Sequence, residues 1–278
     1  MSRWGCLKHA EATTKNSSLA EQFLVPGKPY YLGGYVRMVD NRIYMAWNGL
    51  GDAVRGNRPL TWDPHGQRSL FEGEDPEMRE LFWDGMHSIS TFTGRALANA
   101  VDFAFIQSLL DVGGGSGACS IELCRHYPHL RSTIFDLPLV TEIAARKIAE
   151  AGFGRRVATH PGDFFRDPVL PNSHDAILLC MVLHDWDELQ NAQILAKCYA
   201  ALAPGGTVII TDRLINDEKT GPIAAALNNL MMLVETENGR NYTPAEYSAW
   251  LRDAGFEKTR TVSFEAIGAN GALIASKP

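Results

Sequence analysis

Residues Leu109 to Gly117 read Leu-Leu-Asp-Val-Gly-Gly-Gly-Ser-Gly, and Asp136 follows 19 residues after Gly117. An apolar run that ends in a carboxylate and glycines is typical of a strand followed by a tight turn and a helix. Because glycine has no Cβ atom, the backbone of this turn can approach a bulky ligand closely. A carboxylate about 20 residues later can bind ribose hydroxyls. The stretch therefore predicts a site for the nucleoside part of a cofactor, with Asp111 and Asp136 at the ends of two strands.

The sequence around this stretch alternates between short apolar runs and longer runs with helical spacing. The predicted strands are 108–112, 131–135, 157–160, 176–183 and 207–212, and the helices between them are 118–126, 139–151 and 188–202. This alternation is typical of a parallel sheet with helices on both faces. After a further helix, the last two predicted strands flank a Gly-Ala-Asn-Gly turn and are therefore antiparallel; these three elements are 244–254, 259–264 and 272–276.

The N-terminal quarter of the chain has a different character. Residues 1–70 are rich in Gly, Asn, Pro and Trp and contain only short apolar pieces, which predicts an irregular or partly helical appendage. Asp75-Pro76-Glu77 then combines a helix cap, a proline at the first helical position and an early acid. We therefore divide the chain into an N-terminal appendage, 1–70, and a main domain, 71–278.

The overall composition is that of a globular protein. The chain has 278 residues, of which 45% are hydrophobic, and its net charge is −6. A negative chain offers no basic field for phosphates, so we do not expect nucleic acid as a partner.

The five cysteines form no CxxC pair, which favours a reducing compartment. We see no signal-peptide core, and the longest apolar run is far shorter than the ~20 residues that span a membrane, so we expect a cytoplasmic protein without membrane contact.

Several motifs together carry a resemblance to a known family. They are the glycine stretch, Phe135-Asp136-Leu137-Pro138, Gly162-Asp163-Phe164-Phe165, Leu183-His184-Asp185-Trp186-Asp187-Glu188, Pro204-Gly205-Gly206 and the segment from Phe82 to Ser90. With them, residues 70–278 resemble the class I S-adenosylmethionine-dependent methyltransferases. More narrowly, they resemble the small-molecule O-methyltransferases of the caffeic acid, hydroxyindole and bacterial polyketide type.

The resemblance implies a fold and leaves the assembly open. It implies an α/β, Rossmann-like, doubly wound and mostly parallel seven-stranded sheet that ends in an antiparallel hairpin. The segment from Leu24 to Gly34 resembles the tail of the family's winged-helix dimerisation domain. Most of that domain has no counterpart here, so we expect the appendage to be its remnant and leave a homodimer as an open question.

The resemblance also implies a cofactor, S-adenosyl-L-methionine, and residues that bind it. The backbone at Gly113, Gly115 and Gly117 would face the methionine part, and Asp136 would take the ribose hydroxyls. Asp163 and Phe164 would bracket the adenine, although Asp163 could instead be a turn residue after Pro161-Gly162. We add Asp111 and Ser90 to this predicted cofactor site.

His184 is the predicted general base. Methyl transfer to oxygen requires a positioned acceptor that loses its proton, and an un-ionised phenol needs a base of pKa near 6.5. His184 lies at the end of the predicted strand 176–183, where open α/β sheets bind their ligands. A base works better when a carboxylate orients its other ring nitrogen, and the resemblance assigns this role to Asp212. Asp212 could instead only cap the following loop.

The predicted acceptor site is less well defined. In the register of Gly239-Arg240-x-x-Thr243, the family's second supporting glutamate is replaced by Asn241, whose amide cannot share an imidazolium charge. The other candidates, for which packing in the core is the alternative, are Met86, Trp186, Asn229 and Met232. We expect no catalytic metal, because no second histidine follows His184 at ligand spacing.

The predicted reaction is methyl transfer to a hydroxyl of a small aromatic molecule. Alternatives are methylation of sulfur, nitrogen or carbon on a small acceptor, or cofactor binding without catalysis. A nicotinamide-dependent oxidoreductase is a further alternative, because Gly113-x-Gly115-x-x-Ala118 satisfies the relaxed dinucleotide pattern.

Overall fold

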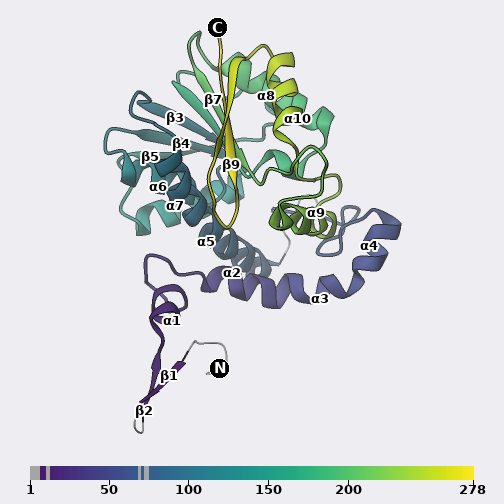
Figure 1. Ribbon diagram of the computed structural model, residues 1–278. Coiled ribbons are helices and arrows are strands. Elements are labelled where there is room, and N and C mark those ends of the chain that lie inside the picture. The colour runs from purple at the N-terminus through teal and green to yellow at the C-terminus, as the bar shows by residue number, and fades with distance from the viewer. Residues whose placement is uncertain (1–6, 11–12, 68–69, 72–74) are drawn as a thin grey trace.

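The computed structural model describes residues 7–10, 13–67, 70–71 and 75–278, and its centre is a seven-stranded sheet (Figure 1). The strands are β3 (Ser108–Val112), β4 (Arg131–Asp136), β5 (Val157–Pro161), β6 (Ala176–Cys180), β7 (Thr207–Asp212), β8 (Glu257–Ser263) and β9 (Gly271–Ser276). Their order is β5-β4-β3-β6-β7-β9-β8. The first five are parallel, and β9 is antiparallel to both β7 and β8. The predicted fold class is confirmed.

Helices cover both faces of this sheet. They are α5 (Pro76–Ala100), α6 (Ala118–His126), α7 (Pro138–Glu150), α8 (Glu188–Ala201), α9 (Ile223–Glu235) and α10 (Pro244–Asp253). Successive strand residues point to opposite faces, so Leu109 packs with α5, α6 and α7 while Leu110 packs with α8 and α10. All five residues of β6 are buried, as expected for a strand covered on both faces.

Helix starts follow the local sequence closely. Asp187 caps α8 through a reciprocal pair with Gln190, and Thr243 caps α10 through the same arrangement with Glu246. Pro76 stands at the first position of α5, after the Asp75 cap. Helix α9, over Ile223–Glu235, is not among the helices predicted from the sequence.

The predicted strand over 176–183 is too long. Strand β6 ends at Cys180, because Met181 has a left-handed φ of 55° and turns the chain away from the sheet. A 3-10 turn, η4 (Leu183–Asp185), follows. His184 therefore lies on this turn, beyond the carboxyl end of the strand.

The N-terminal segment is mostly helical. Its elements are β1 (Leu7–Ala10), β2 (Thr13–Asn16), α1 (Ser18–Phe23), α2 (Gly33–Met38), the π-helical η2 (Val39–Ile43), α3 (Tyr44–Ala46), η3 (Trp47–Gly49) and α4 (Leu50–Gly56). The β1–β2 hairpin and α1 extend away from the sheet, whereas α2, α3 and α4 run below α5 and α9 (Figure 1).

The second half of this segment packs closely on the main domain. A Cβ atom on Gly34 would lie 2.5 Å from the backbone oxygen of Asp84 in α5. The Arg42 side chain, which is mostly buried, pairs with Glu235 at the end of α9, with 3.2 Å between Nη2 and Oε2. The domain boundary at residue 70, and the origin of the segment in a dimerisation domain, stay predictions. Residues 68 and 69 beside that boundary lie outside the described residues, as does Cys6.

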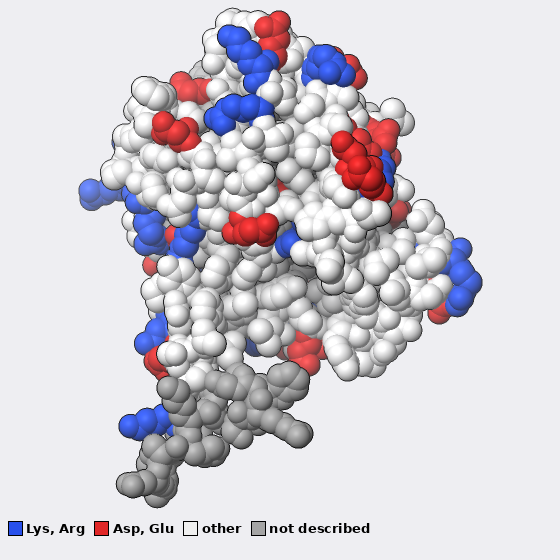
Figure 2. Space-filling view, viewed as in Figure 1, with Lys and Arg blue, Asp and Glu red and all other residues white. Residues whose placement is uncertain are grey.

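Charged side chains are interspersed over the face in Figure 2, and on its non-grey part neither sign forms one continuous patch. Among the described residues, no helix combines the length and apolar character needed to cross a bilayer. In the same part of the chain, no group of three or more His, Cys, Asp or Glu side chains could hold a metal ion. The four cysteines described by the structure are free thiols.

Candidate active site

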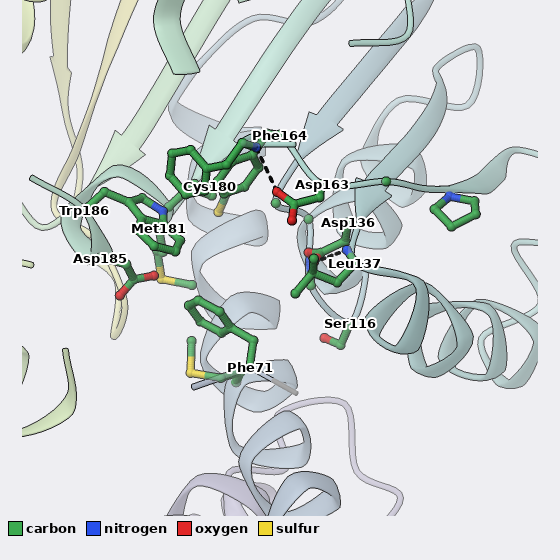
Figure 3. A pocket seen from close by; sticks show the side chains of 18 of the residues that line it. Phe71, Ser116, Asp136, Leu137, Asp163, Phe164, Cys180, Met181, Asp185 and Trp186 are labelled. Atoms are coloured by element: carbon green, nitrogen blue, oxygen red, sulfur yellow. Dashed lines mark hydrogen bonds between the residues drawn. The ribbon is translucent and has the colours of Figure 1, made fainter. Parts of the chain in front are cut away.

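A cavity of about 710 Å³ opens at the carboxyl ends of β3, β4 and β6. Asp136, Leu137 and Ser116 lie on one side of it, and Asp185, Trp186 and Met181 lie on the other (Figure 3). Phe71, from the segment before α5, lies between the two groups. Parallel sheets place ligands at this edge, where the loops after adjacent strands diverge.

The glycine loop forms one wall of the cavity. Gly113 and Gly115 have left-handed φ values of 69° and 56°. A Cβ atom on Gly115 would lie 2.7 Å from the indole of Trp83, so only glycine fits there without a shift. The backbone N–H of Gly115 donates to Oδ2 of Asp136 at 2.8 Å, and that of Leu137 donates to Oδ1 at 2.7 Å. The loop thus fixes the Asp136 carboxylate at the rim of the cavity.

The Asp163 carboxylate is both a turn residue and part of the cavity lining. Its Oδ1 accepts from the backbone N–H of Phe165 at 2.8 Å, which is the turn role considered from the sequence. Phe164 also lines the cavity, and its ring packs edge-on against Trp186 at 5.8 Å between ring centroids. Asp163 and Phe164 thus line the cavity together with Pro161, the last residue of β5.

Two predicted cofactor residues lie outside the cavity lining. Asp111 is fully buried and accepts a hydrogen bond from Ser120 Oγ at 2.6 Å; burial raises its pKa to about 7. Gly117 has no room for a side chain, because its Cβ would lie 2.5 Å from Ile134 of β4. Both residues position the loop from behind, while the predicted Ser90 lines the cavity itself.

His184 and Asp212 are in contact, as predicted. The Nδ1 atom of His184 and Oδ1 of Asp212 form a short hydrogen bond from η4 to the end of β7. The other ring nitrogen, Nε2, lies 3.5 Å from Oδ1 of Asp185. Burial lowers the pKa of His184, but Asp212 and then Asp185 more than compensate and raise it to about 9. The two carboxylates therefore favour the protonated imidazole, whereas burial favours the neutral one.

The cavity itself is lined by Asp185, whereas neither His184 nor Asp212 is part of its lining. The Asp185 side chain stands beside Nε2, and its carboxylate has a pKa raised to about 6, chiefly by burial and against the attraction of His184. The sequence motif His184-Asp185-Trp186 contained this residue, but periodicity gave no means of telling which of its side chains faces the cavity.

Tyr247 completes the environment of Asp212 and was missed from the sequence. Its hydroxyl donates to Oδ2 of Asp212 at 2.9 Å, and its side chain is fully buried. It belongs to α10, 35 residues after Asp212. Its place on the apolar face of the predicted helix 244–254 was the only available signal, and that signal does not distinguish a core tyrosine from a functional one.

The predicted acceptor residues divide into two groups. Met86 and Trp186 line the cavity. Asn229, Met232 and Asn241 do not line it. The backbone N–H of Asn241 donates to Asn229 Oδ1 at 2.7 Å, which ties α9 to the loop before α10. Further lining residues that the sequence did not single out for the acceptor are Phe71, Cys180, Met181 and Gln190.

A model of the O-methyltransferase domain family matches residues 47–257, which is most of the chain. The chain belongs to this family. The resemblance inferred from the motifs is therefore confirmed, and the nicotinamide-dependent alternative is excluded. The match begins at residue 47, within the segment predicted as an appendage.

Individual relatives agree with this membership. A 3-hydroxy-5-methyl-1-naphthoate 3-O-methyltransferase of Streptomyces sahachiroi is 48% identical over 98% of this chain and 78% of its own length. The tetracenomycin polyketide synthesis 8-O-methyltransferase of Streptomyces glaucescens is 35% identical over 98% of this chain and 78% of its own. The crystal structure of human N-acetylserotonin methyltransferase with SAM superposes with a TM-score of 0.88 at 28% identity, covering 99% of this chain and 80% of that one.

The enzyme is an S-adenosylmethionine-dependent O-methyltransferase of the polyketide and hydroxyindole type. The cavity fits this cofactor on its own features. Its glycine wall leaves no space for a side chain at Gly115, and two backbone N–H groups fix the Asp136 carboxylate at its rim.

Proposed function

We propose that this O-methyltransferase methylates a hydroxyl of a small aromatic molecule, with His184 as the general base and Asp212 as the group that orients it. The supporting observation is the hydrogen bond between Nδ1 of His184 and Oδ1 of Asp212. With its Nδ1 proton donated to Asp212, a neutral imidazole carries its lone pair on Nε2, the nitrogen that faces Asp185 at the cavity wall.

We propose that Asp136 holds the ribose hydroxyls and that Phe164 and Asp163 lie beside the adenine. When bound, the cofactor supplies a methyl group from its sulfonium. Loss of the methyl group turns the sulfonium into a neutral thioether, which needs no proton. The protein must therefore position the acceptor oxygen and remove its proton. His184 Nε2 takes that proton as the oxygen–carbon bond forms, and Asp212 stabilises the imidazolium that results.

Aromatic side chains in the lining of the cavity support an aromatic acceptor. Phe71, Phe82 and Trp186 line it, and the rings of Phe71 and Trp186 lie 6.1 Å apart. Flat apolar walls of this kind favour flat apolar ligands. The naphthoate methyltransferase that is 48% identical to this chain acts on a fused aromatic ring, so we propose a hydroxylated fused-ring acid or phenol as the first acceptor to test.

The test is transfer of a labelled methyl group from the cofactor to a panel of hydroxynaphthoates, phenols and hydroxyindoles. His184→Ala should reduce kcat by about 10²–10⁴-fold while calorimetry shows unchanged cofactor binding. The exposed His126, on α6, supplies the matched control His126→Ala, which should keep full activity. A fully active His184→Ala variant would rule out the general base.

Other acceptor atoms are separate outcomes of the same assay. Product analysis that finds label on sulfur, nitrogen or carbon, and none on oxygen, would overturn the proposed acceptor group. A thioether acceptor has no proton to lose, so His184→Ala would then leave turnover nearly intact.

A further inference from the structure

The carboxylate of Asp212 is held by hydrogen bonds on both of its oxygens. Oδ1 accepts from Nδ1 of His184 and from the backbone N–H of Arg213, the latter at 2.8 Å. Oδ2 accepts from the hydroxyl of Tyr247 at 2.9 Å. Asp212 is 1% exposed and Tyr247 is 0% exposed, so water does not substitute for any of these donors.

The Tyr247 ring is itself fixed. It packs edge-on against Trp250 and at a steep angle against Tyr242, each at 5.6 Å between ring centroids. The helix that carries it begins at the capping box of Thr243 and Glu246. A carboxylate torsion is broad and roughly two-fold, so donors on both oxygens restrict it more than donors on one oxygen alone. A rigid donor on Oδ2 therefore selects the orientation in which Oδ1 faces His184.

We propose that Tyr247 is a positioning residue for methyl transfer: its hydroxyl holds Oδ2 of Asp212, so that Oδ1 stays on Nδ1 of His184 and the negative charge on the carboxylate is shared. This role rests on the proposed function of His184 as the base.

The hydroxyl also tunes how strongly Asp212 attracts a proton on His184. A hydrogen bond to an ionised carboxylate disperses its charge. Without that donor, Oδ1 still accepts from His184 and Arg213 and carries more of the carboxylate charge, so the neutral imidazole that acts as the base becomes rarer at a given pH. Burial and the neighbouring Asp212 raise the pKa of Tyr247 well above its usual value, so the phenol remains a donor throughout the working range.

Other groups near this set also influence the titration of His184. Asp185 and the Arg213 side chain act on His184 directly. Glu235 acts on Asp185, and Tyr242 acts on Tyr247. Because Tyr247→Phe leaves all of them in place, a change in the titration of His184 reports on the lost hydroxyl.

The experiment compares Tyr247→Phe with the wild-type enzyme over a range of pH. The midpoint of the rising limb of kcat/KM should move up by about half a unit to one unit, which reduces the rate below the midpoint by roughly three- to tenfold. The KM for the cofactor should stay the same, and the rate should recover at high pH. An NMR titration of the His184 imidazole should show the same upward shift without any turnover.

A matched control is Tyr199→Phe. Tyr199 packs edge-on against Phe256 in the same apolar cluster, so its replacement also removes a phenolic oxygen from this face of the sheet. It should leave the midpoint unchanged. Asp212→Asn combined with Tyr247→Phe should be no slower than Asp212→Asn alone, because Tyr247 acts through Asp212.

An unchanged or lowered midpoint in Tyr247→Phe would overturn the proposal, even if the variant melts earlier. If Tyr247→Phe fails to fold, 3-fluorotyrosine at position 247 keeps the ring and makes the hydroxyl a stronger donor. The midpoint should then move down, and an unchanged midpoint would again overturn the role. The NMR titration separates this result from a failure of His184 as the base, which would appear as full activity in His184→Ala.

Discussion

Oδ1 of Asp185 lies 3.5 Å from Nε2 of His184, so the nitrogen that we propose as the base faces a carboxylate in this structure. Asp185 also lines the cavity, whereas His184 does not. An acceptor hydroxyl that reaches Nε2 must therefore approach beside Asp185, and the charge on Asp185 helps to hold the proton that His184 has to lose.

The first prediction concerns the pH dependence of the wild-type enzyme. His184 must be neutral to accept a proton, and its pKa is raised to about 9 by Asp212 and Asp185 despite burial, which acts in the opposite direction. The protonated form dominates below that value, so kcat/KM should rise with pH and level off only above about 9. The acceptor in this measurement should have a hydroxyl that does not ionise in solution between pH 6 and 9. A kcat/KM that stays constant over that range would contradict this assignment.

The second prediction concerns Asp185→Asn. Replacing the carboxylate by an amide of the same size removes one of the two charges that stabilise the imidazolium. The midpoint of the pH profile should therefore move down, by about one unit. The exposed Asp217 gives a control, because Asp217→Asn changes the net charge equally at a site outside the cavity lining. A midpoint that moves equally in both variants would mean that overall charge, and not contact with Nε2, sets the pKa.

The third prediction concerns the glycine wall. In Gly115→Ala the new Cβ would lie 2.7 Å from the Trp83 indole, and φ is 56°. The strain should cost about 1–3 kcal/mol of stability, and displacement of the loop should weaken cofactor binding about tenfold or more. Denaturant unfolding and calorimetry measure the two effects. Gly154→Ala is the control, since no atom lies within 4 Å of its Cβ position. It should leave cofactor binding unchanged and should not reduce the free energy of unfolding.

The fourth prediction concerns the ion pair that ties the N-terminal segment to α9. The side chains of Arg42 and Glu235 are only 10% and 9% exposed. Glu235→Ala leaves the guanidinium buried without that partner, which should reduce the free energy of unfolding by about 3–5 kcal/mol. Equilibrium urea unfolding gives the value. Lys28→Ala, which breaks a half-exposed pair with Glu21, should cost less than about 1 kcal/mol. Equal losses in the two variants would contradict this account.

Most secondary structure was predictable because it depends on short-range pattern. Apolar alternation and capping residues marked five parallel strands, and the actual ends of β7 and α6 agree with the predicted ones. The end of β6 was wrong because nothing in the local pattern distinguishes Met181, with its left-handed φ, from a further strand residue. Helix α9, Ile223–Glu235, was missed although most of its residues are apolar.

The sequence by itself determined the α/β alternation and the glycine loop with Asp136 after it in the chain. The pairing of His184 with Asp212 was expected from the resemblance to the family. Only the tertiary structure decided that Asp185 faces the cavity, that Tyr247 holds Asp212, and that Asp111 points into the core. Local periodicity sets which face of a helix or strand is buried. The partner that a buried side chain meets depends on sheet order and loop direction, which bring together residues such as Asp212 and Tyr247, 35 positions apart.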